Sequence, residues 1–225
     1  MELLHLTTSD GIKISANYFP AIRTKYPNPR GWVVFLHMMH ATKGSWNMLA
    51  DRLQQEGYAG IAIDLRGHGM SDGGPNGYQQ FSDAEHQESV RDIDAAVDFL
   101  KGLGARNDRI AIIGASIGAN LAMHYVARHR DFKTCVAFSP GLDYHGIVTK
   151  PLMESLPEDK RLLLIGSHDD DRVIDNASDI EVLWNVAPPG IDIKKDIVTT
   201  GGHGTAILSQ NPELIESIIS FLDHE

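Results

Sequence analysis

Two short stretches near the start of the chain alternate between apolar and polar residues, as a strand with one covered face does. The apolar positions are Leu4, Leu6, Ile12, Ile14, Ala16 and Tyr18. The sequence Ser9-Asp10-Gly11 separates the two stretches and is typical of a tight turn. The pattern therefore predicts an antiparallel hairpin at the start of the chain.

The rest of the chain alternates between short apolar runs and longer amphipathic segments. The unbroken apolar run Trp32–Leu36 predicts a central strand covered on both faces. Further strands are predicted at Ala59–Leu65, Arg109–Ile113, Thr134–Phe138, Arg161–Ile165 and Ile191–Val198. Helices are predicted at Ser45–Glu56, Asp83–Leu103, Ile117–Arg130 and Pro212–Leu222, the last with Asn211 as its N-cap. This alternation after a hairpin predicts an α/β fold with a mainly parallel, doubly wound sheet.

The composition is that of one compact domain, and it narrows the choice of partners. Of the 225 residues, 42% are hydrophobic and 22% charged, without an internal repeat, a low-complexity segment or a linker. We therefore expect a single domain over residues 1–225. The formal net charge of -10 argues against nucleic acid as a partner, because nucleic-acid affinity comes largely from clustered Lys and Arg.

The N-terminus and the single cysteine bear on the cellular compartment. Glu2, Asp10 and Lys13 interrupt the apolar residues of the first segment, which therefore lacks the continuous apolar run of a signal peptide or a membrane span. We expect a cytoplasmic protein that does not enter the membrane. Cys135 is the only cysteine and lies in an apolar stretch, which predicts a buried structural thiol and excludes an intramolecular disulfide.

The clearest chemical motif is Gly114-Ala115-Ser116-Ile117-Gly118, at the junction of a predicted strand and a predicted helix. This is the context that the G-x-S-x-G nucleophile elbow requires, and the small residues relieve crowding in the sharp turn that exposes the Ser116 hydroxyl. The alternative is a glycine-rich turn without chemistry. A dinucleotide-binding loop is disfavoured because G-x-G-x-x-G cannot be read here.

A serine hydroxyl is a weak nucleophile at neutral pH, so the motif requires a histidine base and an acid that orients it. Among 11 histidines, His203 is favoured because it follows the last predicted strand, and its neighbouring glycines let the imidazole approach Ser116. The acid is expected in Asp169-Asp170-Asp171, directly after another predicted strand. Asp170 is favoured and Asp171 is second, whereas a solvated turn or a cation site is the alternative for this run.

An acyl-transfer site also needs amide donors where negative charge develops on the substrate oxygen. Ile117, the residue after the nucleophile, is predicted to supply one N–H. The second is predicted from His37-Met38-Met39-His40, with Met39 favoured and Met38 as the alternative. A metal site built from His37 and His40 is disfavoured, because no acidic ligand lies near them in the sequence. We therefore expect neither a metal nor a cofactor.

Taken together, these motifs resemble the α/β-hydrolase superfamily over nearly the whole chain. They include the run from Asp64 to Asp72, with Asp64 and His68, which looks like a family turn that is usually structural. The resemblance implies an α/β-hydrolase fold. It also implies a triad and an oxyanion hole, formed respectively by Ser116, Asp170 and His203, and by the amides of Met39 and Ile117.

The same resemblance indicates the activity, which is hydrolysis of a carboxylic ester of a small molecule through an acyl-enzyme on Ser116. Relatives often carry a lid between the strands that here end near Phe138 and begin near Arg161, and the short gap predicts no sizeable cap. This gap and the apolar residues near the oxyanion loop, Trp46 among them, favour short or medium acyl chains. Alternatives are a thioesterase, a lactonase or a peptidase on the same triad, or a noncatalytic receptor.

Overall fold

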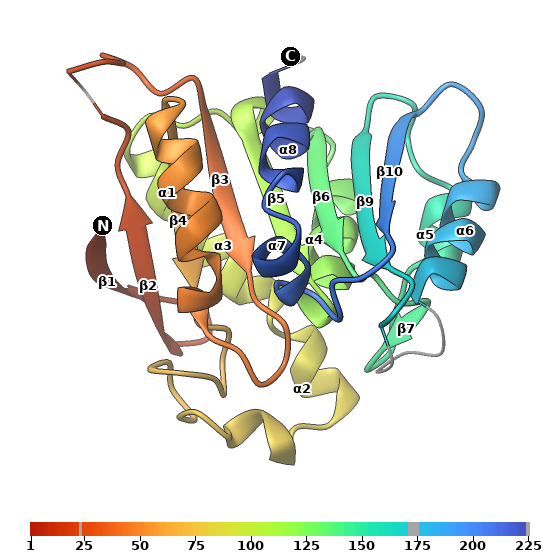
Figure 1. Cartoon of the computed structure of the whole chain (residues 1–225). Coiled ribbons are helices and arrows are strands. Elements are labelled where there is room, and N and C mark those ends of the chain that lie inside the picture. Colours follow the sequence, from red (N-terminus) through yellow and green to blue (C-terminus); the bar gives the residue numbers. More distant parts are fainter. Residues whose placement is uncertain (23, 171–175, 224–225) are drawn as a thin grey trace.

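Eight strands form the main sheet of the computed structural model, which describes residues 1–22, 24–170 and 176–223. The strands are β1 (Glu2–Thr7), β2 (Lys13–Phe19), β3 (Gly31–Leu36), β4 (Tyr58–Ile63), β5 (Ile110–Ala115), β6 (Thr134–Phe138), β9 (Arg161–Ser167) and β10 (Asp192–Val198). Their order across the sheet is β1-β2-β4-β3-β5-β6-β9-β10 (Figure 1). Strand β2 pairs antiparallel with β1 and β4, and the other neighbouring pairs are parallel. The predicted mainly parallel sheet with an antiparallel N-terminal hairpin is confirmed.

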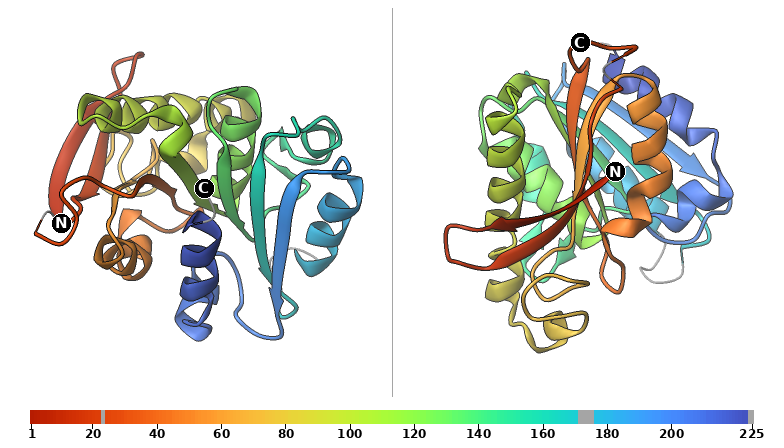
Figure 2. Two further views of the ribbon diagram at one scale, coloured as in Figure 1. Left: turned by 90° about the horizontal axis from the view of Figure 1, so that it is seen from above. Right: turned by 90° about the vertical axis from the view of Figure 1, so that its left-hand side faces the viewer.

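Helices cover both faces of this sheet (Figure 2). The longer helices are α1 (Asn47–Gln55), α3 (Val90–Gly102), α4 (Ile117–Arg128), α6 (Asn176–Val186) and α8 (Leu214–Asp223). The shorter elements are α2 (Asp83–Gln87), α5 (Lys150–Glu154), α7 (Ala206–Gln210), the 3₁₀ turns η1 (Lys43–Trp46), η2 (Gly77–Gln80) and η3 (Asn107–Arg109), and a hairpin of β7 (Asp143–Tyr144) and β8 (Ile147–Val148). The sequence pattern predicts none of α5, α6, α7 or this hairpin.

Alternating side chains of the strands divide the core into two layers. On β3, Val34 packs with residues of α3 and α4, whereas Val33 and Phe35 pack with residues of α1 and α8. Every residue of β3 is buried, because helices cover both faces of the central strands. Burial of one such aliphatic side chain contributes about 2 kcal/mol before the entropy of ordering is subtracted.

The prediction of one long helix at Asp83–Leu103 is wrong, because the structure has two helices there. The ψ angles of Glu88 and Ser89 are -12° and -9°, far from the roughly -42° of an α-helix. The backbone at this point makes shorter-range hydrogen bonds, from the Ser89 N–H to the His86 carbonyl (3.2 Å) and from the Asp92 N–H to the Ser89 carbonyl (3.1 Å). The tighter turn separates α2 from α3.

The last helix also differs from its prediction. It begins at Leu214 rather than at Pro212. Asn211 does not act as the predicted N-cap, because its side-chain amide instead donates to the carbonyl oxygens of Thr200 (2.8 Å) and Ile207 (3.1 Å). The Asn211 side chain therefore joins the loop after β10 to α7.

Two further expectations concern Cys135 and the membrane. Cys135 lies fully buried on β6, and burial raises the pKa of its thiol, as predicted for a structural cysteine. Among the helices of the described residues, none combines the length and the apolar character needed to span a bilayer.

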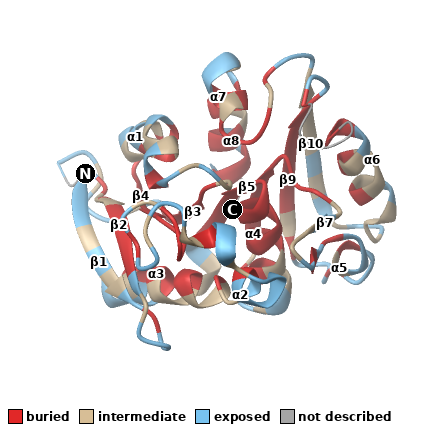
Figure 3. Cartoon of the chain, turned by 90° about the horizontal axis from the view of Figure 1, so that it is seen from below, coloured by how far each residue is buried: buried red, intermediate tan, exposed pale blue. Residues whose placement is uncertain are grey.

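The parallel strands all end at the edge of the sheet that is lowest in Figure 1. Figure 3 views this edge from below, and buried positions continue along β5 and β9 while β1 is largely exposed. Ligand sites of doubly wound sheets lie at the carboxyl ends of their strands. The loops that follow β3, β5, β6, β9 and β10 therefore position any site of this chain.

Candidate active site

Ser116 occupies a strained turn between β5 and α4. Its backbone angles are φ 55° and ψ -121°, a conformation that a non-glycine residue rarely adopts. The turn is held by a 2.8 Å hydrogen bond from the Ser116 N–H to the carbonyl of Phe138 at the end of β6. The side chain stays reachable, with 8% of the residue exposed.

The two glycines that flank Ser116 are required by close packing. A Cβ at Gly114 would lie 2.0 Å from the carbonyl oxygen of Gly118, and a Cβ at Gly118 would lie 2.5 Å from the carbonyl oxygen of Leu36 on β3. Any larger residue would push α4 away from β3 and β5. The G-x-S-x-G pattern is therefore a steric requirement of this sharp turn.

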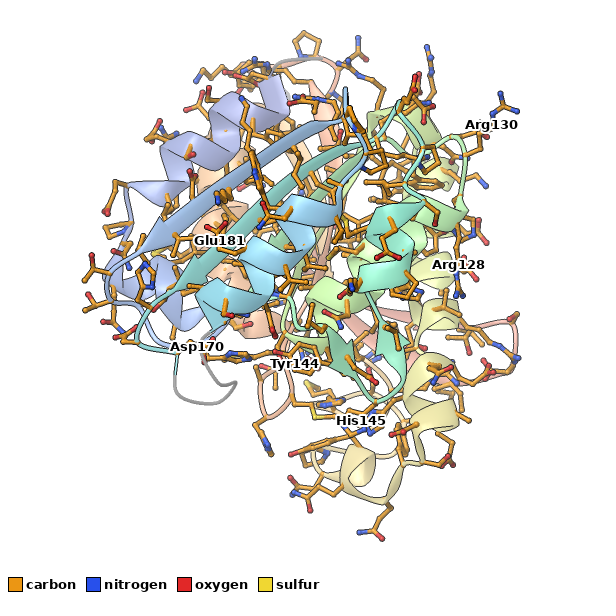
Figure 4. All side chains as sticks on the ribbon, turned by 90° about the vertical axis from the view of Figure 1, so that its right-hand side faces the viewer. Arg128, Arg130, Tyr144, His145, Asp170 and Glu181 are labelled. Atoms are coloured by element: carbon orange, nitrogen blue, oxygen red, sulfur yellow. The ribbon has the colours of Figure 1, made fainter. Side chains whose placement is uncertain are left out.

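His203 pairs with the Asp170 carboxylate across the ends of β9 and β10. The His203 Nδ1 lies 2.6 Å from Asp170 Oδ2, and both residues are buried. A carboxylate only accepts, so the imidazole donates from Nδ1, which leaves Nε2 as the basic nitrogen of the neutral ring. Figure 4 locates Asp170 at the lower edge of the sheet.

The histidine loop lies directly against the nucleophile turn. A Cβ at Gly204, the residue after His203, would lie 3.5 Å from the Cβ of Ala115, the residue before Ser116. Gly204 has a φ of 59°, which favours glycine at this position. The fold thus brings the three sequence-predicted side chains to one place, although no hydrogen bond joins Ser116 to His203 among the described residues.

The adjacent aspartates contact different parts of the histidine loop. Asp169 Oδ1 accepts hydrogen bonds from the backbone N–H groups of Gly201 (2.9 Å) and Gly202 (2.8 Å). The Ser167 hydroxyl also donates to it, and this bond is the largest of the causes that lower the pKa of Asp169. Asp169 therefore holds the loop backbone, while Asp170 contacts the imidazole. Asp171, the second choice for the acid, lies outside the described residues.

Ser139 is a positioning residue that the sequence analysis missed. It follows β6 with a φ of 46° and is fully buried. Its N–H donates to the carbonyl of Ile165 (2.7 Å), and its Oγ accepts from the N–H of Gly204 (2.9 Å). Ser139 thereby joins β6, β9 and the histidine loop. No local sequence signal identifies it beyond its place at a strand end.

The loop after β3 orients the backbone of Met38 and Met39. The Met38 carbonyl accepts from the His37 Nδ1 (2.8 Å) and from the Ala41 N–H (3.1 Å). In a trans peptide the N–H points opposite to the carbonyl, so the N–H of Met39 points away from the His37 ring. The side chain of Met38 packs against the histidine loop, 2.6 Å from a Cβ placed at Gly204.

Ile117 is the first residue of α4 and lies next to Ser116. The first N–H groups of an α-helix have no partner within the helix, and they carry the positive end of the helix dipole. The Ile117 N–H at this position therefore has the chemical character that a developing oxyanion requires.

The histidines of the loop after β3 are engaged by other protein groups. His37 Nδ1 donates to the Met38 carbonyl, and its Nε2 accepts from the N–H of Leu65 (3.0 Å). Burial lowers the pKa of His37, so the ring is neutral. His40 Nδ1 lies 2.5 Å from the Tyr78 hydroxyl. Within the described residues, no three potential metal ligands gather in one place.

A second buried polar group, the Asp64 cluster, consists of Lys43, Asp64, Arg66, His68 and Asp92. Asp64 accepts from the N–H and Nζ of Lys43 (2.7 and 2.6 Å) and from the N–H of Met70 (2.9 Å). Asp92 accepts from the N–H and Nε of Arg66 (2.8 and 2.9 Å). These charges are fully engaged in holding the loop after β4.

Tyr144 and Trp46 occupy different surroundings. Tyr144, on the β7–β8 hairpin, donates a hydrogen bond from its hydroxyl to the Ser139 carbonyl (3.4 Å). Trp46 is fully buried against Phe35 and Phe138, with ring centroids 5.6 Å apart in both pairs. Trp46 is therefore a core residue, which is the more common place for an aromatic side chain, and does not line the oxyanion loop.

The family model described as serine aminopeptidase, S33, matches residues 27–181. The matched range includes Ser116 and Asp170 and ends before His203. The uncharacterized protein YnbC of Escherichia coli K12 is 33% identical over 125 residues, which are 53% of this chain and 19% of that protein. Epoxide hydrolase 3 of Xenopus tropicalis is 32% identical over 102 residues, 45% of this chain and 25% of that protein. The chain thus spans a quarter or less of these curated relatives.

Solved structures resemble the fold over almost the whole chain. An esterase of Pyrococcus furiosus, Pf2001, has a TM-score of 0.75 and 21% identity, covering 98% of this chain and 91% of that chain. An esterase of Exiguobacterium antarcticum, EaEST, has a TM-score of 0.73 and 15% identity, covering 97% of this chain and 98% of that chain. At these identities the likeness is one of fold.

Proposed function

The chain belongs to the serine aminopeptidase S33 family of α/β-hydrolases, and from this membership we propose that it is a serine esterase that forms an acyl-enzyme on Ser116. The observation that carries the proposal is the buried His203–Asp170 hydrogen bond beside a serine with a φ of 55°. A structural turn has no need of backbone strain at a serine whose turn also packs against the loop of a paired histidine.

In the proposed reaction, His203 Nε2 takes the hydroxyl proton of Ser116 as its Oγ attacks the ester carbonyl. Asp170, on Nδ1, holds the ring in the tautomer with a basic Nε2 and stabilises the imidazolium. The amides of Ile117 and Met39 are proposed to bind the oxyanion, with Met38 as the alternative for the second donor. Water then hydrolyses the acyl-enzyme by the reverse proton movements.

We also propose a preference for short or medium acyl chains and a chain without a sizeable cap. Between β6 and β9 the chain forms only the two-residue strands β7 and β8 and the short helix α5. Such a segment provides little apolar surface to cover a long acyl chain. A series of nitrophenyl esters is expected to give its highest kcat/KM with a short or medium acyl chain. A maximum at long chains would contradict this preference.

Fluorophosphonate labelling tests the enzyme proposal directly. The probe is expected to label the wild-type chain, and Ser116→Ala is expected to abolish the labelling. Ser155→Ala is the matched control, because Ser155 is exposed on the far end of α5 and is expected to leave labelling intact. Unlabelled but folded wild-type protein would favour a noncatalytic receptor.

The family description favours a peptidase as the second candidate. The same triad cleaves amides and esters, so the choice depends on the leaving group. Leucine nitroanilide and nitrophenyl butyrate distinguish the two. A higher kcat/KM on the nitroanilide would replace the esterase proposal by an aminopeptidase.

A further inference from the structure

The outer face of α4 carries a cavity of about 100 Å³, which is lined by α4, the start of α3 and the β7–β8 hairpin. A wider hollow adjoins this α4 cavity toward α5, and the two share His124, Arg128 and Gly146. Arg128 comes twelve residues after Ser116, about 18 Å along the helix. Figure 4 shows Arg128 well apart from Asp170. A molecule bound in the α4 cavity would therefore lie away from the proposed triad.

Arg128 gives these walls a positive charge that has no partner. Among the described residues that line the α4 cavity and the adjoining hollow, it is the only formally charged side chain. The chain has 30 acidic residues against 20 Lys and Arg, yet no carboxylate in the described part of the chain pairs with the Arg128 guanidinium. The guanidinium is thus open to an anion from solution.

The position of Arg128 at the end of α4 does not account for this charge. Cations are common near a helix C-terminus because they offset the dipole and bind the last carbonyl oxygens. Here the buried Lys160 fills that role. Its Nζ donates to the carbonyl oxygens of His129 (3.0 Å), Arg130 (3.0 Å) and Phe132 (2.6 Å). The end of α4 therefore does not require a second cation.

His124, which lies beside Arg128, does not add to the charge. Burial is the largest cause that lowers the pKa of His124, and the charge of Arg128 lowers it further. The His124 Nε2 lies 2.7 Å from the Val148 carbonyl and donates to it. The positive charge of the cavity at neutral pH therefore comes from Arg128.

The remaining wall of the α4 cavity is largely aliphatic. Val90, Leu121 and Ile147 line it, and the last two are buried residues. Hydrocarbon groups of a ligand gain free energy when they leave water for such a wall. The cavity thus combines one cation with an apolar surface.

Hydrogen bonds from two helices fix the hairpin that closes this cavity. Asn120 on α4 donates to the carbonyl of Ile147 (2.8 Å), and Gln87 on α2 donates to the carbonyl of His145 (3.0 Å). A cavity whose walls are already held costs a ligand little ordering entropy. The α4 cavity is therefore formed before any ligand binds.

We propose that the α4 cavity binds a small organic acid, with its carboxylate on Arg128 and its hydrocarbon part against the aliphatic wall. A guanidinium and a carboxylate pair through two parallel N–H···O bonds. The aliphatic wall favours such an acid over an inorganic anion, which has no apolar part to bury. Binding at this site requires no turnover at Ser116.

Isothermal titration calorimetry tests the site with three probes: butyrate, its neutral analogue butyramide, and inorganic phosphate. The titrations are run at constant ionic strength and at about pH 8, where an ordinary histidine is neutral. Butyrate is expected to bind the wild-type chain with a Kd of about 1 mM. Butyramide and phosphate are each expected to bind at least about tenfold more weakly, because one lacks the charge and the other lacks the apolar part.

Arg128→Gln removes the charge and is expected to weaken butyrate binding at least about tenfold. The unfolding midpoint is expected to stay unchanged, because Arg128 is exposed and unpaired among the described residues. Arg130→Gln is the matched control and is expected to leave the Kd unchanged. Arg130 is also exposed but lines neither the α4 cavity nor the adjoining hollow, so far as the described residues define them.

Four results would overturn the inference. Unchanged butyrate affinity in Arg128→Gln would place the acid elsewhere, for example at the proposed active site. Equal weakening in both arginine variants would reduce the effect to the overall charge of the surface. Phosphate binding as tight as butyrate binding would make this an inorganic-anion site, and a wild-type chain that does not bind butyrate would leave no acid site. None of these results bears on fluorophosphonate labelling of Ser116, which decides the proposed function separately.

Discussion

The Asp64 cluster and the Ser116 cluster, formed by Ser116, Asp170 and His203, both lie buried at the carboxyl edge of the sheet but differ in the groups that face their carboxylates. In the Asp64 cluster, each carboxylate faces a cation and backbone N–H donors. In the Ser116 cluster, the carboxylate of Asp170 faces the imidazole of His203 beside a serine hydroxyl, and Nε2 of this imidazole makes no hydrogen bond among the described residues.

This difference separates a structural network from a reactive one. A buried charge is tolerated when an opposite charge and hydrogen-bond donors or acceptors surround it. Removing one partner from such a network is costly, because the other charge is then buried without a partner. A reactive site needs a nucleophile and a base with capacity left for substrate. The four predictions that follow test this division, from the largest expected change in free energy to the smallest.

The largest effect is expected for Ser116→Ala. Loss of the nucleophile is expected to lower kcat for nitrophenyl acetate by about a millionfold, the order seen when interdependent catalytic groups are removed. The unfolding midpoint is expected to change little. Near-normal ester turnover would remove Ser116 from the mechanism.

Ser71→Ala is its counterpart in the loop of the Asp64 cluster. The buried Ser71 hydroxyl donates to the Asp64 carbonyl (2.6 Å) and accepts from the Ser15 N–H (2.9 Å). Its removal is expected to lower the free energy of unfolding by about 1–3 kcal/mol while kcat changes only slightly. A large loss of kcat in Ser71→Ala would contradict the division into a structural cluster and a reactive cluster.

The second prediction compares two neighbouring aspartates with the same substitution. Asp170→Asn is expected to lower kcat about ten-thousandfold, because an amide no longer selects the tautomer with a basic Nε2 on His203. Asp169→Asn is expected to lower it about tenfold at most, since the Asn oxygen still accepts from the loop N–H groups. Nitrophenyl ester kinetics give both values, and the reverse order would assign the acid to Asp169.

The third prediction concerns the structural cluster alone. Arg66→Met leaves the fully buried Asp92 carboxylate without its cation, and we expect the free energy of unfolding in urea to fall by about 3–5 kcal/mol. Arg106→Met is the control, because its ion pair with Asp108 is exposed and is expected to contribute about 1 kcal/mol or less. Equal effects of the two variants would contradict the structural role of Arg66.

The fourth prediction uses pH. Burial lowers the pKa of His68 from 6.5 to about 4, and its buried Nε2 has no hydrogen-bond partner among the described residues. The unfolded chain therefore binds a proton at higher pH than the folded chain does. His68 is expected to make stability fall as the pH drops from 6.5 to about 4, by about 3 kcal/mol in all.

Urea unfolding of the wild type and of His68→Phe measures this slope. Phenylalanine keeps a ring against Tyr78, on which His68 stacks with a centroid distance of 4.2 Å, but it does not titrate. The variant is expected to show a shallower loss of stability over this pH range. The same slope in both proteins would exclude His68 as its source.

Much of the fold followed from local pattern. The apolar runs such as Trp32–Leu36 identify central strands because both of their faces are covered. The alternation near Ile14 identifies a strand too, but its polar residues Ser15 and Asn17 are buried as well, so the expected exposed face is covered. The pattern failed at Glu88 and Ser89, where residues that suit a helix adopt a tighter turn. Tertiary packing, including the contact of His86 with His145, decides that turn.

Within the candidate site, Ser116 is found from sequence because strand, small residues and helix must follow one another directly in the chain. His203 is found less directly, from its place after the last predicted strand. Ser139 has no such signal, since a serine after a strand is common.

Periodicity and one short motif were therefore enough for the α/β fold class and for the serine, because both depend on residues close together in the chain. Tertiary structure alone distinguishes the contacts of Asp169 from those of Asp170, and brings Ser139 to the histidine loop. The physical reason is that these contacts depend on the directions in which polar groups point. Which way a carboxylate, a carbonyl or a hydroxyl points is set by the register between strands and by strained backbone angles, and no local pattern of residue types records either.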